Sequence, residues 1–293
     1  MSQKFTPLII IGAPRSGTNM LRDVLDALPG FDTWPCDEIP LIWRHGNLRA
    51  INDELPASAA KPSIKRYIWS QFCKEASRHK CDVLIEKTCA NSLRVAFTKA
   101  VVPQAKYIYI VRDGRDVVAS AHKRWTSGFE LGYTLAKIRY MPWSDVPYHG
   151  FQFAWNRFYR LFSKQKRIAV WGPRFRGLEE ALKTKSLDEV CGLQWQACVE
   201  ASDRDFAGMD PTEVYRLRYE DFVENPGRHV REIAAFLGQL VSEQDIDSAI
   251  KPVKKSSVGK GRNEIDAETM ERVEVLLKPT LLRHGYVDEL QSV

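Results

Sequence analysis

A short polar stretch near the N-terminus has the residue types and spacing of an anion-binding loop. Gly12 and Gly17 enclose four residues, and Arg15 lies two positions before the second glycine. An arginine can bridge a terminal anionic group and the oxygen that leaves it without a metal ion. Further hydrogen bonds to an anion are available from Ser16, Thr18 and Asn19. We therefore predict a phosphate-binding loop, with an ordinary glycine-bounded turn as the alternative.

The residues on either side of the loop predict the elements that position it. Residues 8–11 form an apolar, β-branched run that ends at Gly12, which is typical of a buried parallel strand. After Ser16 the apolar residues recur at helical spacing, at Leu21, Val24, Leu25 and Leu28. A strand, a loop and a helix in succession bring free backbone N–H groups and the positive end of a helix dipole to one point. An anion is expected at that point.

The same glycine spacing also occurs in nucleotide-binding P-loops, so two other classes of protein remain open. A P-loop needs Lys after its second glycine and then Ser or Thr for magnesium, whereas this chain has Thr18 and Asn19. These residues disfavour ATP as the ligand. A P-loop kinase of a small molecule is one alternative function, and a non-catalytic protein that binds a nucleotide or an anionic glycan is the other.

Composition limits the class of protein. A chain of 293 residues can bury the core of one large α/β domain, and we expect a single domain over residues 1–293 with an aromatic-rich insertion at about 124–165. The net charge of +6 suits an anionic ligand, but no dense basic stripe indicates a nucleic-acid partner. No apolar segment is long enough to cross a bilayer and no secretory leader is recognisable, so we expect a cytoplasmic protein without an integral membrane segment.

The six cysteines have neither a C-x-x-C pair nor the Cys/His spacing of a zinc site. We therefore expect free thiols and no bound metal.

Four further strands are predicted, and three of them are followed by polar residues of interest. The strands are expected at residues 81–85, 105–111, 168–171 and 214–218, and a helix is expected from about Gly150. Glu86, Lys87 and Thr88 follow the first strand directly, Arg112 follows the strand at 105–111, and Tyr219 follows the strand at 214–218. Ser120 falls on a helix predicted to start near Asp116. Because ligands of open α/β sheets bind beyond the carboxyl ends of the strands, Arg112 and Ser120 are expected to face the ligand. The alternatives are a plain surface lysine at Lys87, an Arg-Asp salt-bridge turn at Arg112 and a strand-end anchor at Tyr219.

These stretches, in this order, resemble the sulfotransferases that use 3′-phosphoadenosine 5′-phosphosulfate (PAPS). The matching motifs are PRSGT at 14–18, EKT at 86–88, VRDGRD at 111–116, YED at 219–221 and GKGR at 259–262. They are closer to the bacterial and carbohydrate branches of the family than to the cytosolic small-phenol enzymes. The resemblance implies a P-loop-type central parallel sheet flanked by helices, with helical and loop insertions forming the acceptor side. It also implies transfer of the sulfonyl group of PAPS to a hydroxyl, which we expect on a saccharide or glycolipid.

The resemblance also implies roles for individual residues. Glu38 matches the base that takes the proton from the acceptor, with Asp37 as the alternative, and Lys87 and Arg15 would contact the transferring sulfonyl group. By residue type alone, Asp37 and Glu38 are an ordinary surface pair. Where the cytosolic branch has a histidine base, this chain has Cys89, a poor proton acceptor near neutral pH. The residues matching the PAPS-binding positions are Arg15, Ser16, Gly17, Thr18, Asn19, Arg112, Ser120, Tyr219, Lys260, Gly261 and Arg262.

Two segments have no settled role in the sequence. The basic, glycine-interrupted stretch 254–262 is expected either to fold over the cofactor, as the family resemblance implies, or to be a mobile arm. The stretch WGPRFRG at 171–177 is predicted to be a basic turn that could meet an anionic acceptor, and nothing in the sequence assigns it a function.

Overall fold

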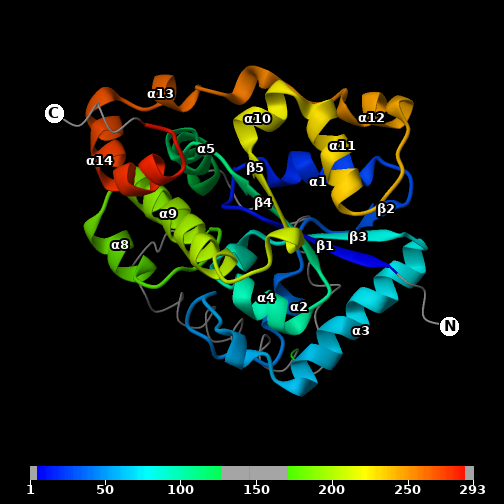
Figure 1. The fold of residues 1–293 in the computed structure, drawn as a ribbon. Coiled ribbons are helices and arrows are strands. Elements are labelled where there is room, and N and C mark those ends of the chain that lie inside the picture. The colour runs from blue at the N-terminus through cyan, green and yellow to red at the C-terminus, as the bar shows by residue number, and fades with distance from the viewer. Residues whose placement is uncertain (1–4, 127–144, 146–170, 288–293) are drawn as a thin grey trace.

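A five-stranded parallel sheet forms the centre of the molecule (Figure 1). The computed structural model describes residues 5–126, 145 and 171–287. Its strands lie in the order β2-β3-β1-β4-β5, and every neighbouring pair is parallel. The strands are β1 (Thr6–Ile11), β2 (Phe31–Thr33), β3 (Val83–Lys87), β4 (Lys106–Val111) and β5 (Val214–Arg218). Because all strands run the same way, their carboxyl ends meet at one edge of the sheet.

Strand β1 occupies the middle of the sheet, and its apolar run is buried on both faces. Leu8 and Ile10 point into one hydrophobic cluster, whereas Ile9 and Ile11 point into the other. A strand whose side chains alternate between two cores must be apolar throughout. This requirement explains the continuous run LIII in place of an alternating pattern.

Helices cover both faces of the sheet and make a three-layer sandwich (Figure 1). One layer consists of α1 (Thr18–Asp26), α10 (Tyr219–Glu224), α11 (Pro226–Phe236) and α12 (Glu243–Ile250). The other contains α2 (Pro40–Arg44), α3 (Pro62–His79), α4 (Val95–Val101), α5 (Gly114–Thr126), α8 (Leu178–Thr184), α9 (Leu187–Phe206) and α14 (Ala267–Arg283). The short helix α13 (Gly261–Glu264) lies against α5. The predicted fold class, a central parallel sheet flanked by helices, is confirmed.

The predicted strands correspond to β1, β4 and β5 within two residues, but β2 at Phe31–Thr33 was not predicted and β3 is displaced. The strand expected at 81–85 is β3, which begins two residues later and extends through Lys87. Glu86 and Lys87 therefore belong to the sheet, and their side chains leave the strand on opposite faces. Two buried charged residues end this strand because both have polar partners at the carboxyl edge.

Several expectations concern residues outside the described part of the chain. The aromatic-rich insertion at about 124–165 lies there almost entirely, as do the helix expected from Gly150 and most of the strand expected at 168–171. Among the described residues, no helix combines the length and the apolar composition that a bilayer crossing requires.

Burial in the larger of the two cores predicts a contrast between two isoleucines. Ile68 of α3 has no exposed surface, whereas Ile51 is 83% exposed. Ile68→Ala should lower the free energy of unfolding by about 2–5 kcal/mol because it leaves a cavity. Ile51→Ala should change it by less than about 0.5 kcal/mol. Urea denaturation followed by circular dichroism checks both, and equal losses would contradict this assignment of the core.

Candidate active site

The carboxyl edge of the sheet opens into one large cavity. Its volume is about 890 Å³, which is within the usual range for small-molecule sites. The loop after β1, the end of β3 and Arg112 after β4 all contribute to its wall. The lining residues that bear functional groups are Arg15, Thr18, Asn19, Asp37, Glu38, Asp53, Lys87, Cys89, Arg112, Arg124, Trp171 and Tyr219. The cavity therefore unites residues from widely separated parts of the sequence.

The loop between β1 and α1 has the backbone geometry of a tight anion cradle. Arg15 and Gly17 both adopt positive φ, at 70° and 86°. A Cβ on Gly17 would lie 2.3 Å from the ring of Tyr219, so only glycine fits there. A non-glycine residue with positive φ is uncommon and costs free energy, which is a mark of functional loops. Ser16 is fully buried, and its Oγ has no hydrogen-bond partner among the described residues.

Four of the predicted site residues lie together beside the loop, as their predicted positions at the carboxyl edge of the sheet imply. They are Arg15, Arg112, Ser120 and Tyr219. Arg15 Nε donates to Ser120 Oγ at 2.9 Å, and Arg112 Nη1 donates to the carbonyl oxygen of Arg15 at 3.2 Å. The guanidinium of Arg112 stacks over the Tyr219 ring, 4.4 Å from its centroid. Two arginines and an aromatic ring thus gather beside the loop, which suits a ligand with phosphate groups and a planar base.

The segment containing Gly259 and Gly261 is anchored beside this cluster. The buried carboxylate of Asp116 accepts the backbone N–H of Gly259 at 2.8 Å and that of Gly261 at 2.7 Å. The same carboxylate accepts Arg112 Nη2 at 3.3 Å. A Cβ on Gly261 would lie 2.5 Å from the Arg115 carbonyl oxygen, so this close approach requires glycine. These hydrogen bonds favour an ordered segment over a mobile arm at the two glycines.

The outer part of that segment does not line the cavity in the described structure. Lys260 is exposed and is absent from the cavity wall. The side chain of Arg262 lies outside the described residues.

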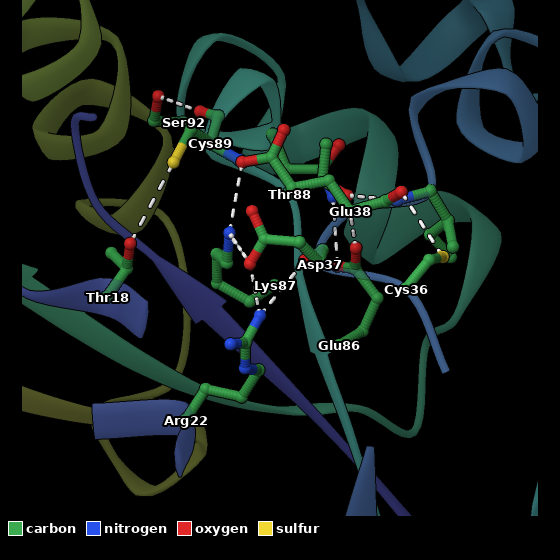
Figure 2. Close-up of polar contacts among 12 residues, drawn as sticks. Thr18, Arg22, Cys36, Asp37, Glu38, Glu86, Lys87, Thr88, Cys89 and Ser92 are labelled. Carbon is green, nitrogen blue, oxygen red and sulfur yellow. Dashed lines mark hydrogen bonds and ion pairs between the residues drawn. The ribbon is translucent and has the colours of Figure 1, made fainter. Parts of the chain in front are cut away.

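Lys87 lies between two carboxylates, as Figure 2 shows. Its Nζ is 3.1 Å from Asp37 Oδ1 and 3.1 Å from Glu38 Oε1, and only 1% of its side chain is exposed. Burial alone would lower the pKa of Lys87, but the two carboxylates outweigh it and the pKa is raised. The ammonium is therefore charged, and the segment after β2 that carries Asp37 and Glu38 lies in the same cavity wall as the loop.

The two candidate bases have further contacts besides Lys87. Asp37 also forms an ion pair with Arg22 of helix α1. Burial would raise the pKa of Asp37, but Lys87 and Arg22 together lower it. Glu38 Oε1 also accepts the backbone N–H of Cys89 at 3.3 Å. The two cations beside Asp37 favour its ionised form.

Cys89 is a neutral thiol in this site. Burial, together with the nearby Glu38, raises the pKa of its thiol well above the ordinary value. Its Sγ lies 3.8 Å from Thr18 Oγ1. A protonated thiol takes up no proton, so the base must be another residue.

The turn at 171–174 is the part of the cavity wall that sequence reasoning left without a role. Gln194 of α9 is buried, and its Nε2 donates to the carbonyl oxygens of Trp171 and Pro173, at 3.0 Å each. Arg174 N donates to Asp53 Oδ2 at 2.8 Å. These bonds fix the turn from two sides. The unusual WGPR sequence at 171–174 marks this turn in the chain, but only the fold shows that it lines the cavity.

A family model described as the sulfotransferase family matches residues 7–169 of the 293. This match covers more than half of the sequence, including the loop, Lys87 and the Arg112 region. The chain belongs to the sulfotransferase family.

Solved sulfotransferase structures share this fold at low sequence identity. The sulfotransferase domain from the curacin biosynthetic pathway is 13% identical, with a TM-score of 0.55 over 94% of this chain and 99% of that one. The sulfotransferase domain of the Synechococcus PCC 7002 olefin synthase is 14% identical, with a TM-score of 0.51 over 94% and 96%. Sulfotransferase STF9 from Mycobacterium avium is 12% identical, with a TM-score of 0.51 over 94% and 76%. A search of the curated proteins found no match to the sequence.

In the part of the chain that the structure describes, no three or more His, Cys, Asp or Glu side chains are grouped as metal ligands would be. The six cysteines are free thiols.

The Asp116 anchor predicts how the Gly259–Gly261 segment responds to mutation. Asp116→Asn replaces one acceptor oxygen with an amide nitrogen, which cannot accept a backbone N–H. Loss of one hydrogen bond should speed amide exchange at Gly259 or Gly261 about 10-fold. Amide exchange measured by NMR checks this.

The matched control is Asp188→Asn, because that carboxylate contacts His122 and not the segment. Equal exchange at both glycines in wild type and in Asp116→Asn would contradict the anchoring.

Proposed function

We propose that the protein is a sulfotransferase that moves the sulfonyl group of PAPS to a hydroxyl of a saccharide. One observation carries the proposal: the anion loop, Lys87 and Glu38 line the same cavity at the carboxyl edge of the sheet. This juxtaposition combines a site for an anionic group, a buried cation and a carboxylate base.

The donor would be held by residues from both ends of the chain. The loop backbone and Arg15 would bind the 5′-phosphosulfate, in keeping with a helix N-terminus and a fork-shaped cation. Arg112, Ser120 and the segment 260–262 would bind the 3′-phosphate, as the family resemblance implies. Tyr219 offers a ring on which the adenine could stack. The buried Ser16 Oγ, which has no hydrogen-bond partner among the described residues, could donate to a phosphate oxygen of the ligand.

The transfer would be an in-line displacement at sulfur. The acceptor oxygen forms a bond to sulfur while the bond between sulfur and the bridging phosphate oxygen breaks. The electron pair of the broken bond stays on the phosphate of 3′-phosphoadenosine 5′-phosphate (PAP), and Glu38 takes the hydroxyl proton. Lys87 and Arg15 would offset the negative charge on the sulfonyl oxygens and on the leaving phosphate.

Glu38 is the candidate base that the family resemblance favours, with Asp37 as the alternative. Lys87 contacts both carboxylates, and Asp37 also pairs with Arg22. A lowered pKa makes Asp37 a weak proton acceptor, so its role would be to hold Lys87 in place.

The 171–173 turn would form the wall that meets the acceptor. Trp171, Gly172 and Pro173 line the cavity, and Gln194 fixes the turn that contains them. An indole offers a flat apolar face that packs on the C–H face of a sugar ring. Trp171, in a turn held by Gln194, therefore supports the saccharide acceptor that the family resemblance implies.

Removing the proposed base tests the function directly. Glu38→Gln should lower kcat about 10²–10⁴-fold, because the amide cannot accept the proton, while the affinity for PAP changes little. The measurement is PAP release from PAPS with the fastest acceptor in a saccharide panel, together with calorimetric titration of PAP.

The comparison variant is Asp37→Asn, which keeps the proposed base. A larger loss of kcat in Asp37→Asn than in Glu38→Gln, or wild-type turnover in Glu38→Gln, would contradict the assignment.

A second variant tests the acceptor wall. Trp171→Ala should raise KM for the acceptor about 10-fold, the order expected for losing one aromatic contact, with KM for PAPS unchanged. Trp69→Ala is the matched control, because Trp69 stacks on Phe5 and does not line the cavity. Equal effects of the two variants on acceptor KM would exclude this role for Trp171.

A further inference from the structure

A buried polar cluster lies directly behind the proposed base, on the opposite face of strand β3 from Lys87. Glu86 and Thr88 flank Lys87 in the sequence, and Figure 2 shows both beside Glu38. Glu86 has no exposed surface and Thr88 only 1%. A carboxyl group buried this deeply needs hydrogen-bond donors, and those donors link Glu86 to neighbouring segments of the chain.

Thr88 connects Glu86 to the segment that contains the base. The Thr88 hydroxyl donates to Glu86 Oε1 at 2.5 Å and accepts the backbone N–H of Ile39 at 3.1 Å. Because a hydroxyl has one proton, its donation to Glu86 orients its lone pairs toward the Ile39 amide. Ile39 is the residue after Glu38, so its backbone sets the direction from which the Glu38 side chain leaves the chain.

The other oxygen of Glu86 is also fixed. Asn91 Nδ2 donates to Glu86 Oε2 at 3.0 Å, and Arg94 Nε donates to Asn91 Oδ1 at 2.9 Å. Arg94 has no exposed surface, and its Nη1 lies 3.6 Å from Asp53 Oδ1. Burial lowers the pKa of Arg94 to about 10, so it stays charged at neutral pH and balances the nearby carboxylates. The two oxygens of the Glu86 side chain thus have one donor each in fixed directions, and burial raises the pKa of Glu86 to about 7.

The consecutive residues 87–89 contact the segment that contains the base at two points. Lys87 Nζ and Cys89 N both donate to Glu38 Oε1. Thr88, which lies between them in the sequence, accepts the backbone N–H of Ile39 at its Oγ1. The side chain of Glu38 and the backbone beside it are therefore held by the same short stretch of chain. Displacing a catalytic group by 1 Å can cost about 10²-fold in rate.

We propose that Glu86 is a positioning residue that, through the Thr88 hydroxyl, fixes the Ile39 backbone and so aims Glu38 at the acceptor hydroxyl. The inference rests on the proposed function only in giving Glu38 the role of base. Within the EKT motif, Lys87 would act on the sulfonyl group, while Glu86 and Thr88 would hold the base.

Two substitutions at Thr88 separate the hydroxyl from the rest of the side chain. Thr88→Val keeps the shape and removes the hydrogen bonds, and Thr88→Ser keeps the hydroxyl. We expect Thr88→Val to speed amide exchange at Ile39 about 10-fold and to lower kcat about 10²-fold, with PAP affinity unchanged. Thr88→Ser should restore both values to near wild type.

Controls separate positioning from a general loss of stability. Thr98→Val removes a buried hydroxyl that bonds within α4 and to Tyr107, so it should leave Ile39 exchange and kcat unchanged. If Thr88→Val fails to fold, Glu86→Gln provides the second variant. It deprives either Thr88 or Asn91 of an acceptor, and it should raise Ile39 exchange and lower kcat.

Two results are informative in opposite ways. Unchanged Ile39 exchange in Thr88→Val, or a fall in kcat equal to that of Thr98→Val, would overturn the proposal. Faster Ile39 exchange with wild-type turnover in Glu38→Gln would instead show that the base assignment of the proposed function is wrong, while the anchoring of Ile39 by Thr88 stands.

Discussion

A lysine ammonium almost completely withdrawn from water at the end of β3 is the constraint on which this site depends. Lys87 is the last residue of the strand and only 1% of its side chain is exposed. A charge buried in this way is stable only beside opposite charge. Asp37 and Glu38 supply it, and they must be brought across the sheet edge from the segment after β2. The segment is also held by the hydrogen bond from Ile39 N to Thr88 and by the ion pair of Arg22 with Asp37.

The second constraint is close backbone approach beside the anion loop. Gly17 leaves room for Tyr219, and Gly261 leaves room for the backbone at Arg115. Tyr219 in turn supports Arg112, whose other contacts are with the Arg15 carbonyl and the Asp116 carboxylate. Elements from the start, the middle and the end of the chain therefore converge beside this loop. The location of the cavity is a consequence of the parallel topology, which brings the ends of the strands to the same edge.

Much of the fold could be predicted from local sequence patterns. The continuous apolar run of β1 ends at a glycine, the residues after Gly17 have a clear helical spacing, and strand β5 was predicted with its observed bounds. The predicted strand ended at residue 85, whereas β3 continues through Lys87. Glu86 and Lys87 are charged, and charged residues usually indicate the end of a buried strand. Only tertiary partners make them compatible with burial. The anchoring of Gly259 and Gly261 was likewise invisible, since it depends on a carboxylate more than 140 residues away in the sequence.

The loop and its ligand form the central claim, and calorimetry tests it most directly. Purified protein would be titrated with PAP and, separately, with ATP plus magnesium, using wild type and Arg15→Ala. The account predicts saturable binding of PAP to wild type, much weaker binding to Arg15→Ala, and little binding of ATP with magnesium. Tight binding of ATP with magnesium and none of PAP would contradict the account and would indicate a nucleotide-dependent kinase in place of a PAPS-dependent sulfotransferase.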